Sequence, residues 1–154
     1  VLYAGLMITA EGPKVLEYNA RFGDPETQVL MPMIKEDLLP VLEASATGNL
    51  RSMAVKINTG ACVGVVLASG GYPGTYKKGM VITGLENLDR DTMVFHAGTA
   101  LFEGRLQTDG GRVLAVVSRG ENIAEAIQKV YQEAAKISFK GIHYRRDIGH
   151  RALR

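Results

Sequence analysis

The residues best suited to chemistry lie close together near the start of the chain. Glu17, Asn19 and Arg21 alternate along a run rich in β-forming residues, shortly before Asp24. Alternate side chains of a strand share a face, with neighbours about 6.6 Å apart at a rise of ~3.3 Å per residue. A carboxylate and an amide oxygen at this spacing can reach one Mg²⁺ ion, which is usually shared with nucleotide phosphates. On the same face, Arg21 could contact a phosphoryl oxygen or an acyl phosphate.

The same alternation has a structural interpretation. Glu17, Asn19 and Arg21 would then form the solvated face of a half-buried strand, while Leu16 and Tyr18 face the core. Three alternating polar residues are not a specific signal, so the pattern alone favours this structural interpretation.

A β-hairpin is expected to carry these residues. Residues 1–9 and 14–21 are rich in β-forming residues, and residues 10–13 between them form a turn signal. Because the first residues already resemble a strand under way, we expect further sequence before them.

Two short helices should follow the hairpin. Asp24 can cap the first, with Pro25 at the first helical position, where its missing N–H is harmless. Pro32 should kink or end that helix, because proline in a helix interior costs about 3 kcal/mol. Asp37 can cap the second helix, which should end near residues 47–48.

The next part of the chain reads as a small mixed or antiparallel β-domain. Short β-rich runs separated by glycine lie at residues 53–58, 61–69, 80–83, 92–96 and 112–118. Residues 58–60 and 109–111 resemble tight hairpin connections, because glycine reaches positive φ without steric cost. The best domain boundary lies at residues 48–52.

One strong helix should cover the sheet. Asn122 and Glu125 form a capping-box pattern. Apolar residues then recur at three- and four-residue steps, at Ile123, Ile127, Val130, Ala134 and Ile137. This period places them on one helical face, which should pack on one face of the sheet. The expected fold class is α+β.

Composition argues against several classes of protein and partner. The net charge of +2 is too small to indicate a nucleic-acid or anionic-membrane partner. No apolar run approaches the ~18–20 residues of a membrane span, and the first residues lack the features of a signal peptide. The single cysteine, Cys62, excludes an intrachain disulfide and a cysteine-based zinc site. We expect it to fill core space, in keeping with a reducing cytosol.

The glycine-rich segment of residues 70–79 has two interpretations. It could present backbone N–H groups and lysines to a phosphate. A turn-rich connection is favoured, because the segment lacks the Gly-Lys-Ser/Thr ending of a P-loop and a clear strand and helix around it.

The histidines and the basic tail are expected to be structural or solvated. His96, His143 and His150 have no metal-ligand spacing. His96, in a β-rich run, is expected to be a hydrogen-bonded structural residue. The tail is expected to be solvated surface rather than an RNA contact, and its cations are Arg145, Arg146, Arg151 and Arg154.

Longer motifs give a more specific signal. Residues 5–29 hold Gly-Leu-Met-Ile-Thr and then Gly-Pro-Lys-Val-Leu-Glu-Tyr-Asn-Ala-Arg-Phe-Gly-Asp-Pro-Glu-Thr-Gln-Val. Four blocks follow in order, Val-Val-Leu-Ala-Ser-Gly-Gly-Tyr-Pro-Gly, Phe-His-Ala-Gly-Thr, Gly-Gly-Arg-Val-Leu-Ala-Val and Tyr-Arg-Arg-Asp-Ile-Gly. Together they cover nearly the whole chain and resemble the phosphoribosylamine-glycine ligase family of the ATP-grasp superfamily. The Glu-x-Asn-x-Arg string alone indicates only the superfamily, whereas the later blocks favour this ligase over relatives such as biotin carboxylase.

The resemblance implies an ATP-dependent ligase of purine biosynthesis. In that family, ATP phosphorylates the carboxylate of glycine to glycyl phosphate. The amine of 5-phosphoribosylamine then attacks it, giving glycinamide ribonucleotide, ADP and phosphate. By this resemblance, Glu17 and Asn19 would be ligands of Mg²⁺, or of Mn²⁺, on the ATP phosphates, and Arg21 would stabilise charge on the transferring group. Asp24 would orient glycine or 5-phosphoribosylamine, with capping of the next helix as its alternative role.

The resemblance also implies a division of the chain. Residues 1–50 would close an ATP-grasp domain, and residues 51–154 would form the small β-rich C-terminal domain with its long helix. The N-terminal substrate domain and the segment that covers ATP would be missing partners, so the isolated chain is expected to be inactive. The implied location is cytoplasmic, with neither nucleic acid nor membrane as a partner. The alternative is a non-catalytic binding or interaction module, because the chain holds only one wall of a site.

Overall fold

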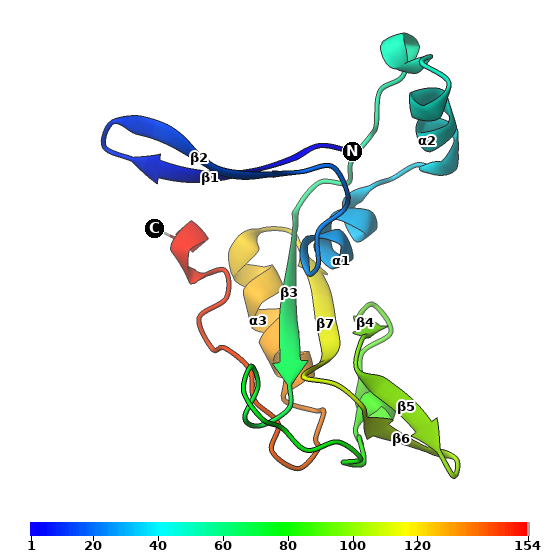
Figure 1. The fold of residues 1–154 in the computed structure, drawn as a ribbon, viewed down its shortest axis with the longest axis vertical. Coiled ribbons are helices and arrows are strands. Elements are labelled where there is room, and N and C mark those ends of the chain that lie inside the picture. Colours follow the sequence, from blue (N-terminus) through cyan, green and yellow to red (C-terminus); the bar gives the residue numbers. More distant parts are fainter. Residues whose placement is uncertain (154) are drawn as a thin grey trace.

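The computed structural model describes residues 1–153, which run from an N-terminal hairpin to a sheet with one long helix (Figure 1). The hairpin consists of β1 (Tyr3–Thr9) and β2 (Gly12–Asn19). The short helices α1 (Glu26–Leu30) and α2 (Leu39–Ala46) follow it. The mixture of helix and sheet agrees with the expected α+β class.

The opening hairpin forms as predicted, but its apolar side chains are exposed. β1 and β2 pair antiparallel along their length, and the hairpin projects from the rest of the molecule (Figure 1). The sequence predicts that Leu16 and Tyr18 face a core, yet they are 64% and 63% exposed. That prediction is wrong for this structure, because the hairpin's main contacts are between its own two strands.

Both short helices end where their sequences predict. α1 stops just before Pro32, which lies in the 3-10 turn η1 (Met31–Met33). At the start of α2, Asp37 Oδ1 accepts a hydrogen bond from Leu39 N at 2.9 Å. A second 3-10 turn, η2 (Leu50–Ser52), follows α2.

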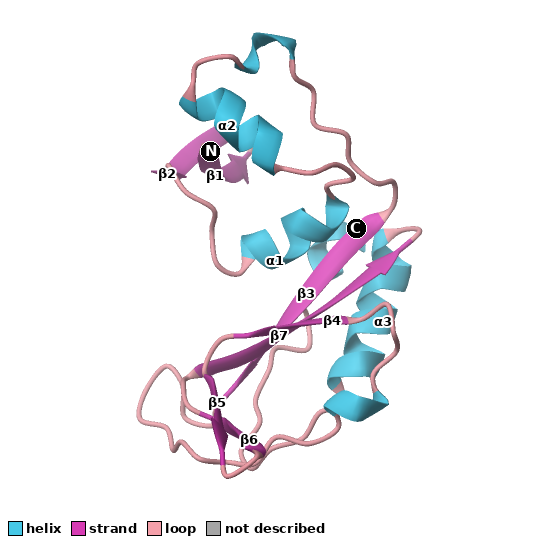
Figure 2. Cartoon of the chain, turned by 90° about the vertical axis from the view of Figure 1, so that its right-hand side faces the viewer, coloured by secondary structure: helices cyan, strands magenta, loops and turns pink. Residues whose placement is uncertain are grey.

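An antiparallel sheet forms the centre of the C-terminal part. β7 (Arg112–Gly120) lies between β3 (Ala61–Ala68) and β4 (Met93–His96). The helix α3 (Ile123–Ala134) runs along β3 and β7 (Figure 2). The predicted helix therefore packs on the sheet, but it ends at Ala134, before Ile137 of the predicted apolar stripe.

The core lies between α3 and this sheet, where burying each Val or Leu side chain stabilises the fold by about 1.5–3 kcal/mol. Its largest fully buried aliphatic side chains are Leu67, Leu114, Val65, Val113, Val116 and Val130. At the start of α3, Asn122 Oδ1 accepts from Glu125 N at 3.0 Å. The second half of the predicted capping box differs, because Glu125 Oε2 accepts from Glu121 N.

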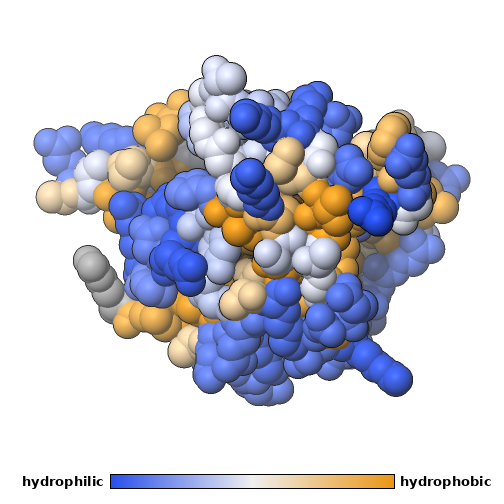
Figure 3. All heavy atoms as spheres, turned by 90° about the horizontal axis from the view of Figure 1, so that it is seen from below, coloured by the Kyte–Doolittle hydropathy of each residue, from blue (hydrophilic) through white to orange (hydrophobic). Residues whose placement is uncertain are grey.

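A further hairpin, β5 (Thr99–Phe102) and β6 (Arg105–Thr108), is not predicted by the sequence analysis. Its turn holds Glu103 at φ +47° and Gly104 at φ +73°, which is left-handed backbone. Phe102 is 60% exposed. Viewed from below, the molecule shows apolar patches within a largely polar surface (Figure 3).

Two predicted strands and both predicted hairpin turns are wrong. Residues 53–58 and 80–83 make isolated bridges only. Residues 58–60 lead from an irregular segment into β3, and residues 109–111 join β6 to β7, which lie in different sheets. A β-rich run becomes a strand only where a partner strand continues beside it.

The C-terminal tail is held against α3 by Tyr131. Its Oη donates to Arg145 O at 2.9 Å and accepts from Ile148 N at 3.0 Å. The hydrogen bond and charge of Arg145 lower the pKa of Asp147 below its ordinary value. The tail ends in η4 (His150–Leu153), and Arg154, expected to be solvated, lies outside the described residues.

Cys62 is free and half-buried on β3, rather than fully buried as the predicted core filler. Burial raises the pKa of its thiol above the ordinary value, although the charge of Arg119 opposes this.

Among the described residues, no helix is both long and apolar enough to cross a membrane.

Candidate functional site

Glu17 and Asn19 leave the same face of β2, because they lie two residues apart in that strand. Their partners on β1 are Gly5 and Tyr3 respectively. A Cβ on Gly5 would lie 3.0 Å from Glu17 Cγ, so the glycine gives the Glu17 side chain room beside β1. Within residues 1–153, Glu17 takes part in no ion pair, and its carboxylate is left free to bind a cation.

A β-bulge lies next to Glu17. Gly5 pairs with Glu17 but Leu6 pairs with Val15, so Leu16 is the extra residue on β2. A bulge bends its strand and turns the neighbouring side chains, which is why bulges are common beside active sites. The bulge thus contributes to the direction in which Glu17 and Asn19 point.

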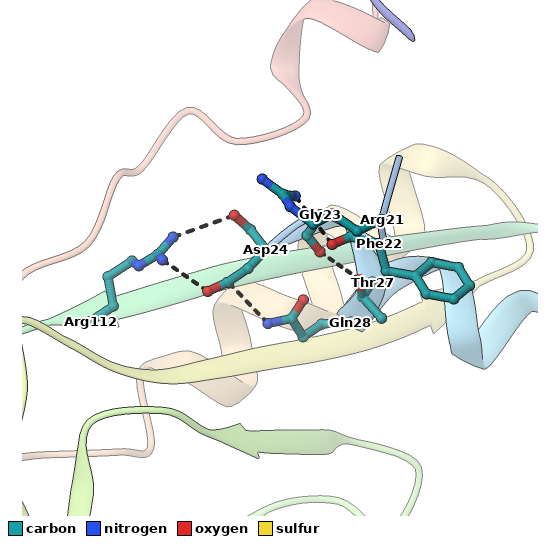
Figure 4. A network of polar contacts seen from close by, with 7 residues as sticks. All are labelled: Arg21, Phe22, Gly23, Asp24, Thr27, Gln28 and Arg112. Atoms are coloured by element: carbon teal, nitrogen blue, oxygen red, sulfur yellow. Dashed lines mark hydrogen bonds and ion pairs between the residues drawn. The ribbon is translucent and has the colours of Figure 1, made fainter. Parts of the chain in front are cut away.

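Arg21 lies after β2, in the loop that leads to α1, so the prediction that it shares a strand face with Glu17 and Asn19 is wrong. Its Nη1 donates to Phe22 O at 3.1 Å, so the guanidinium folds back over this loop (Figure 4). The side chain is exposed and makes no described ion pair, which leaves its remaining donors available to an anion.

Asp24 joins the loop to the C-terminal sheet instead of capping α1. Arg112 Nη2 pairs with Asp24 Oδ2 at 2.8 Å, and Arg112 Nη1 donates to Asp24 O at 3.4 Å (Figure 4). Asp24 Oδ1 accepts from Gln28 Nε2 at 3.2 Å. The predicted capping role is wrong, because α1 begins after Pro25 without a side-chain cap and Gly23 O accepts from Thr27 N.

A pocket of about 340 Å³ lies between this loop and β4. Asp24 and Gln28 line it from the N-terminal side, and Phe95 and His96 from β4. Its other lining residues are Phe22, Gly23, Thr27 and Met31. Glu17, Asn19 and Arg21 are not among them, so the structure gathers the predicted residues along one stretch without enclosing them in one cavity.

A larger hollow of about 750 Å³ lies between α3, the start of β4 and the end of β7. Charged residues of both signs line it, including Asp91, Arg119 and Lys129. None of the residues predicted to do chemistry contributes to this hollow. We therefore assign the candidate site to the smaller pocket, which contains Asp24.

Sequence analysis singled out neither Gln28, which lines the pocket, nor Arg112, which lies beside it; both contact the Asp24 carboxylate. His96, predicted only as a structural residue, lines the pocket, and its Nδ1 lies 3.0 Å from Thr99 Oγ1. The hydrogen bond of His96 confirms part of its prediction. Arg112 lies 88 residues after Asp24, and no local pattern signals a contact at that separation.

The segment of residues 70–79 forms a turn against the sheet. Gly71 has φ +98°, and Tyr72 packs so closely on Gly111 that a Cβ there would lie 2.1 Å from its ring. Lys78 pairs with Asp109 at 3.1 Å. Phosphate binding by this segment stays untested. Among the described residues, no three His, Cys, Asp or Glu side chains are grouped as metal ligands.

Two segments of the chain match known protein families. Residues 62–151 match the family Phosphoribosylglycinamide synthetase, C domain. Residues 1–27, which include Glu17 to Asp24, match the family Phosphoribosylglycinamide synthetase, ATP-grasp (A) domain. The chain belongs to the phosphoribosylglycinamide synthetase family.

Known members of the family resemble the chain over almost all its length. It is 51% identical over 148 residues to the phosphoribosylamine–glycine ligase of Caldanaerobacter subterraneus, covering 96% of this chain and 35% of that protein. It is 52% identical over 155 residues to the trifunctional purine biosynthetic protein adenosine-3 of Gallus gallus, covering 99% of this chain and 16% of that protein. The crystal structure of the Thermotoga maritima phosphoribosylamine–glycine ligase matches with a TM-score of 0.80 and 41% identity. That match covers 95% of this chain and 36% of the Thermotoga chain.

The chain thus spans about a third of the Caldanaerobacter and Thermotoga ligases. The predicted resemblance to this ligase family is confirmed. The roles of Glu17, Asn19, Arg21 and Asp24 are not tested by these comparisons and stay predictions.

Proposed function

We propose that this chain forms one wall of the catalytic centre of an ATP-dependent ligase. The reaction joins glycine to 5-phosphoribosylamine through glycyl phosphate and gives glycinamide ribonucleotide, ADP and phosphate. The observation that carries the proposal is the match of residues 1–27 to the ATP-grasp domain, together with the free Glu17 carboxylate on the strand that this segment forms. The chain contributes only part of the enzyme and is inactive by itself.

Glu17 and Asn19 would hold the metal. Both offer oxygen atoms from one strand face, and Mg²⁺ and Mn²⁺ accept such ligands. The metal would neutralise charge on the ATP phosphates during transfer. Two protein ligands hold Mg²⁺ weakly without nucleotide, because this ion keeps several waters and is usually shared with phosphates.

Arg21 would act on the transferring group and Asp24 on a substrate. The guanidinium of Arg21 presents several N–H donors in a fixed fork, which suits phosphoryl and acyl-phosphate oxygens. Asp24 is held by Arg112 and Gln28, so its carboxylate lies in a defined position at the edge of the pocket. A carboxylate so placed can orient the amine of glycine or of 5-phosphoribosylamine.

The proposal also covers domain organisation and location. Residues 1–50 would complete an ATP-grasp domain, and residues 51–154 would form the C-terminal domain, with further segments of the enzyme supplying the rest of the ATP and substrate sites. A cytoplasmic location, without nucleic acid or membrane as a partner, is part of this proposal.

The test is a full-length chimera in which this chain replaces the matching segment of the Caldanaerobacter ligase. We expect ADP formation that requires both glycine and 5-phosphoribosylamine. Glu17→Gln should raise the Mg²⁺ concentration needed for half-maximal rate, whereas Arg105→Gln, on the distant hairpin of β5 and β6, should not. A folded chimera without glycine-dependent ADP formation would contradict the proposed function.

The alternative function is a non-catalytic interaction module. The exposed apolar residues of the β1–β2 hairpin favour it, since Ile8 is 74% exposed and Leu16 is 64% exposed. A sheet edge with such side chains can pair with another copy. Light scattering that shows only monomer across a wide concentration range would count against this alternative.

A further inference from the structure

We propose that His96 is a catalytic residue of the ligase, whose Nε2 accepts a proton when the amine of 5-phosphoribosylamine attacks glycyl phosphate. This inference rests on the proposed ligase function and adds a general base to it.

The amide-forming step must move a proton. As the N–C bond forms, the amine nitrogen gives up one hydrogen, and the C–O bond to phosphate breaks with its electron pair on the phosphate oxygen. Nε2 of His96 takes the proton from the nitrogen and returns it to the departing phosphate, so the imidazole ends neutral. A positioned side chain that transfers a proton in this way accelerates a reaction by about 10²–10⁴-fold.

The ring of His96 is held at one nitrogen and free at the other. His96 is the last residue of β4, and its Nδ1 lies 3.0 Å from the hydroxyl of Thr99, the first residue of β5. This hydroxyl can accept Nδ1–H, which leaves the lone pair of the neutral ring on Nε2. No hydrogen bond within residues 1–153 engages Nε2, and the side chain is exposed and lines the pocket. The pocket is therefore provided with an oriented and unoccupied base.

Asp24 is the other side chain of the pocket lining that could take a proton. Its Oδ2 pairs with Arg112 at 2.8 Å, and its Oδ1 accepts from Gln28 Nε2 at 3.2 Å (Figure 4). Both carboxylate oxygens thus already have donors, whereas Nε2 of His96 has none. The carboxylate suits a fixed orienting role, and the imidazole suits proton transfer.

The rest of the lining favours removal of the proton. Phe22, Met31 and Phe95 give the pocket apolar surface. The attack places positive charge on the amine nitrogen, and apolar surroundings disfavour that charge unless a base takes the proton. Among the described lining residues there is neither lysine nor arginine, so no cation of the lining repels the imidazolium as it forms.

The test uses the full-length chimera described above with His96→Ala, followed in a single turnover so that product release does not limit the rate. We expect formation of glycinamide ribonucleotide to slow at least about 100-fold. The KM values for ATP and glycine should change less than about twofold, because His96 acts on the attacking amine. The matched control is His143→Ala, which removes an exposed imidazole from the C-terminal segment and should leave the rate unchanged.

Free imidazole separates proton transfer from a structural role. Removal of the side chain opens space at the pocket, where imidazole from solution can enter and take the proton. We expect imidazole to accelerate His96→Ala at least about tenfold, a part of the roughly 10²–10⁴-fold that a positioned base provides. The compound 1,2,4-triazole, a ring of the same size and a much weaker base, should give no acceleration.

A slowing of less than about 100-fold in His96→Ala would overturn the inference. A slow variant that neither ring accelerates, or that both rings accelerate equally, would overturn it too, since His96 would then only fix the turn between β4 and β5. If His96→Ala does not fold, His96→Gln must show the same slowing with unchanged KM values for ATP and glycine, and a smaller effect overturns the inference. A parent chimera without glycine-dependent ADP formation would instead refute the proposed function, and the inference would fall with it.

Discussion

Replacing Gly98 by alanine should destabilise the C-terminal part strongly. Gly98 lies between β4 and β5, where its backbone meets the segment that precedes β7. An alanine Cβ would lie 2.5 Å from Gly110 Cα, 2.6 Å from Arg112 O and 2.8 Å from Gly110 N. All three are backbone atoms, so no side-chain rotation relieves the clash and the two segments must separate.

The size of the effect follows from that separation. Crowding a packed site costs about 1–3 kcal/mol, and a weakened hydrogen bond adds about 1 kcal/mol. The bonds at risk are Gly98 N to Arg112 O at 2.9 Å and Asp109 N to Gly98 O at 2.7 Å. We therefore expect a loss of at least about 2 kcal/mol in the free energy of unfolding, or about 4 °C or more in Tm.

Urea denaturation followed by circular dichroism measures this loss. The control is Gly74→Ala, where the sole close neighbour of a new Cβ is Gly71 O at 3.2 Å. Its effect should stay within about 1 kcal/mol, because alanine at a compatible site also restricts the unfolded chain. A Gly98→Ala protein as stable as the control would refute the reasoning, since it would mean that the two glycine backbones do not approach as described.

Three further predictions concern other features of the C-terminal part. Asn122→Ala removes the acceptor for Glu125 N and should cost about 1 kcal/mol of stability, whereas Asn122→Ser should restore most of it; thermal unfolding checks this, and equal Tm values for Ala and Asn would contradict it. Tyr131→Phe should cost about 1–3 kcal/mol because Ile148 N loses its acceptor, and hydrogen exchange at that amide should speed up; unchanged exchange would argue against the contact. Burial raises the pKa of the Cys62 thiol, so alkylation of the folded protein should reach its half-maximal rate at a higher pH than in urea. Because the unfolded thiol ionises first, stability should fall as the pH rises above the ordinary thiol value of about 8.5, and a stability that is flat there in the wild type would count against this linkage.

Elements with long, consistent local signals could be predicted from the sequence. α3 combines an N-cap with an unbroken apolar period. β3 and β7 are continuous runs of mainly apolar residues without proline, eight and nine residues long. Pro32 marks the end of α1 because its ring and missing N–H do not fit a continuing helix. In each case the local chemistry and the tertiary packing favour the same structure.

Short elements could not be predicted because their partners decide them. β5 and β6 have four residues each, and their turn is Glu103–Gly104 rather than the Asn-Gly or Asp-Gly that signals a hairpin. Residues 53–58 have β-forming composition, but only a short stretch of their backbone is hydrogen-bonded to residues 33–35. These hydrogen bonds run from Lys35 N to Lys56 O and from Asn58 N to Met33 O. Neither outcome follows from composition, since both depend on which backbone lies alongside.

The candidate site also has one part that the sequence predicts and one part that tertiary contacts decide. Glu17 and Asn19 share a face through the period of a strand, which the sequence reveals. The position of Asp24 depends on tertiary contacts that the sequence does not reveal. Helix α1 has five residues and is too short to be stable without tertiary packing.

Two contacts with the sheet supply that packing. Val29 lies over Gly64 of β3, where a Cβ would come within 3.0 Å of Val29 Cγ1. Arg112 of β7 pairs with the Asp24 carboxylate at 2.8 Å. The C-terminal sheet therefore acts as the support that fixes the loop of the proposed substrate site. For that reason, changes at Gly64 or Arg112 should alter substrate binding even though neither residue is proposed to touch ATP.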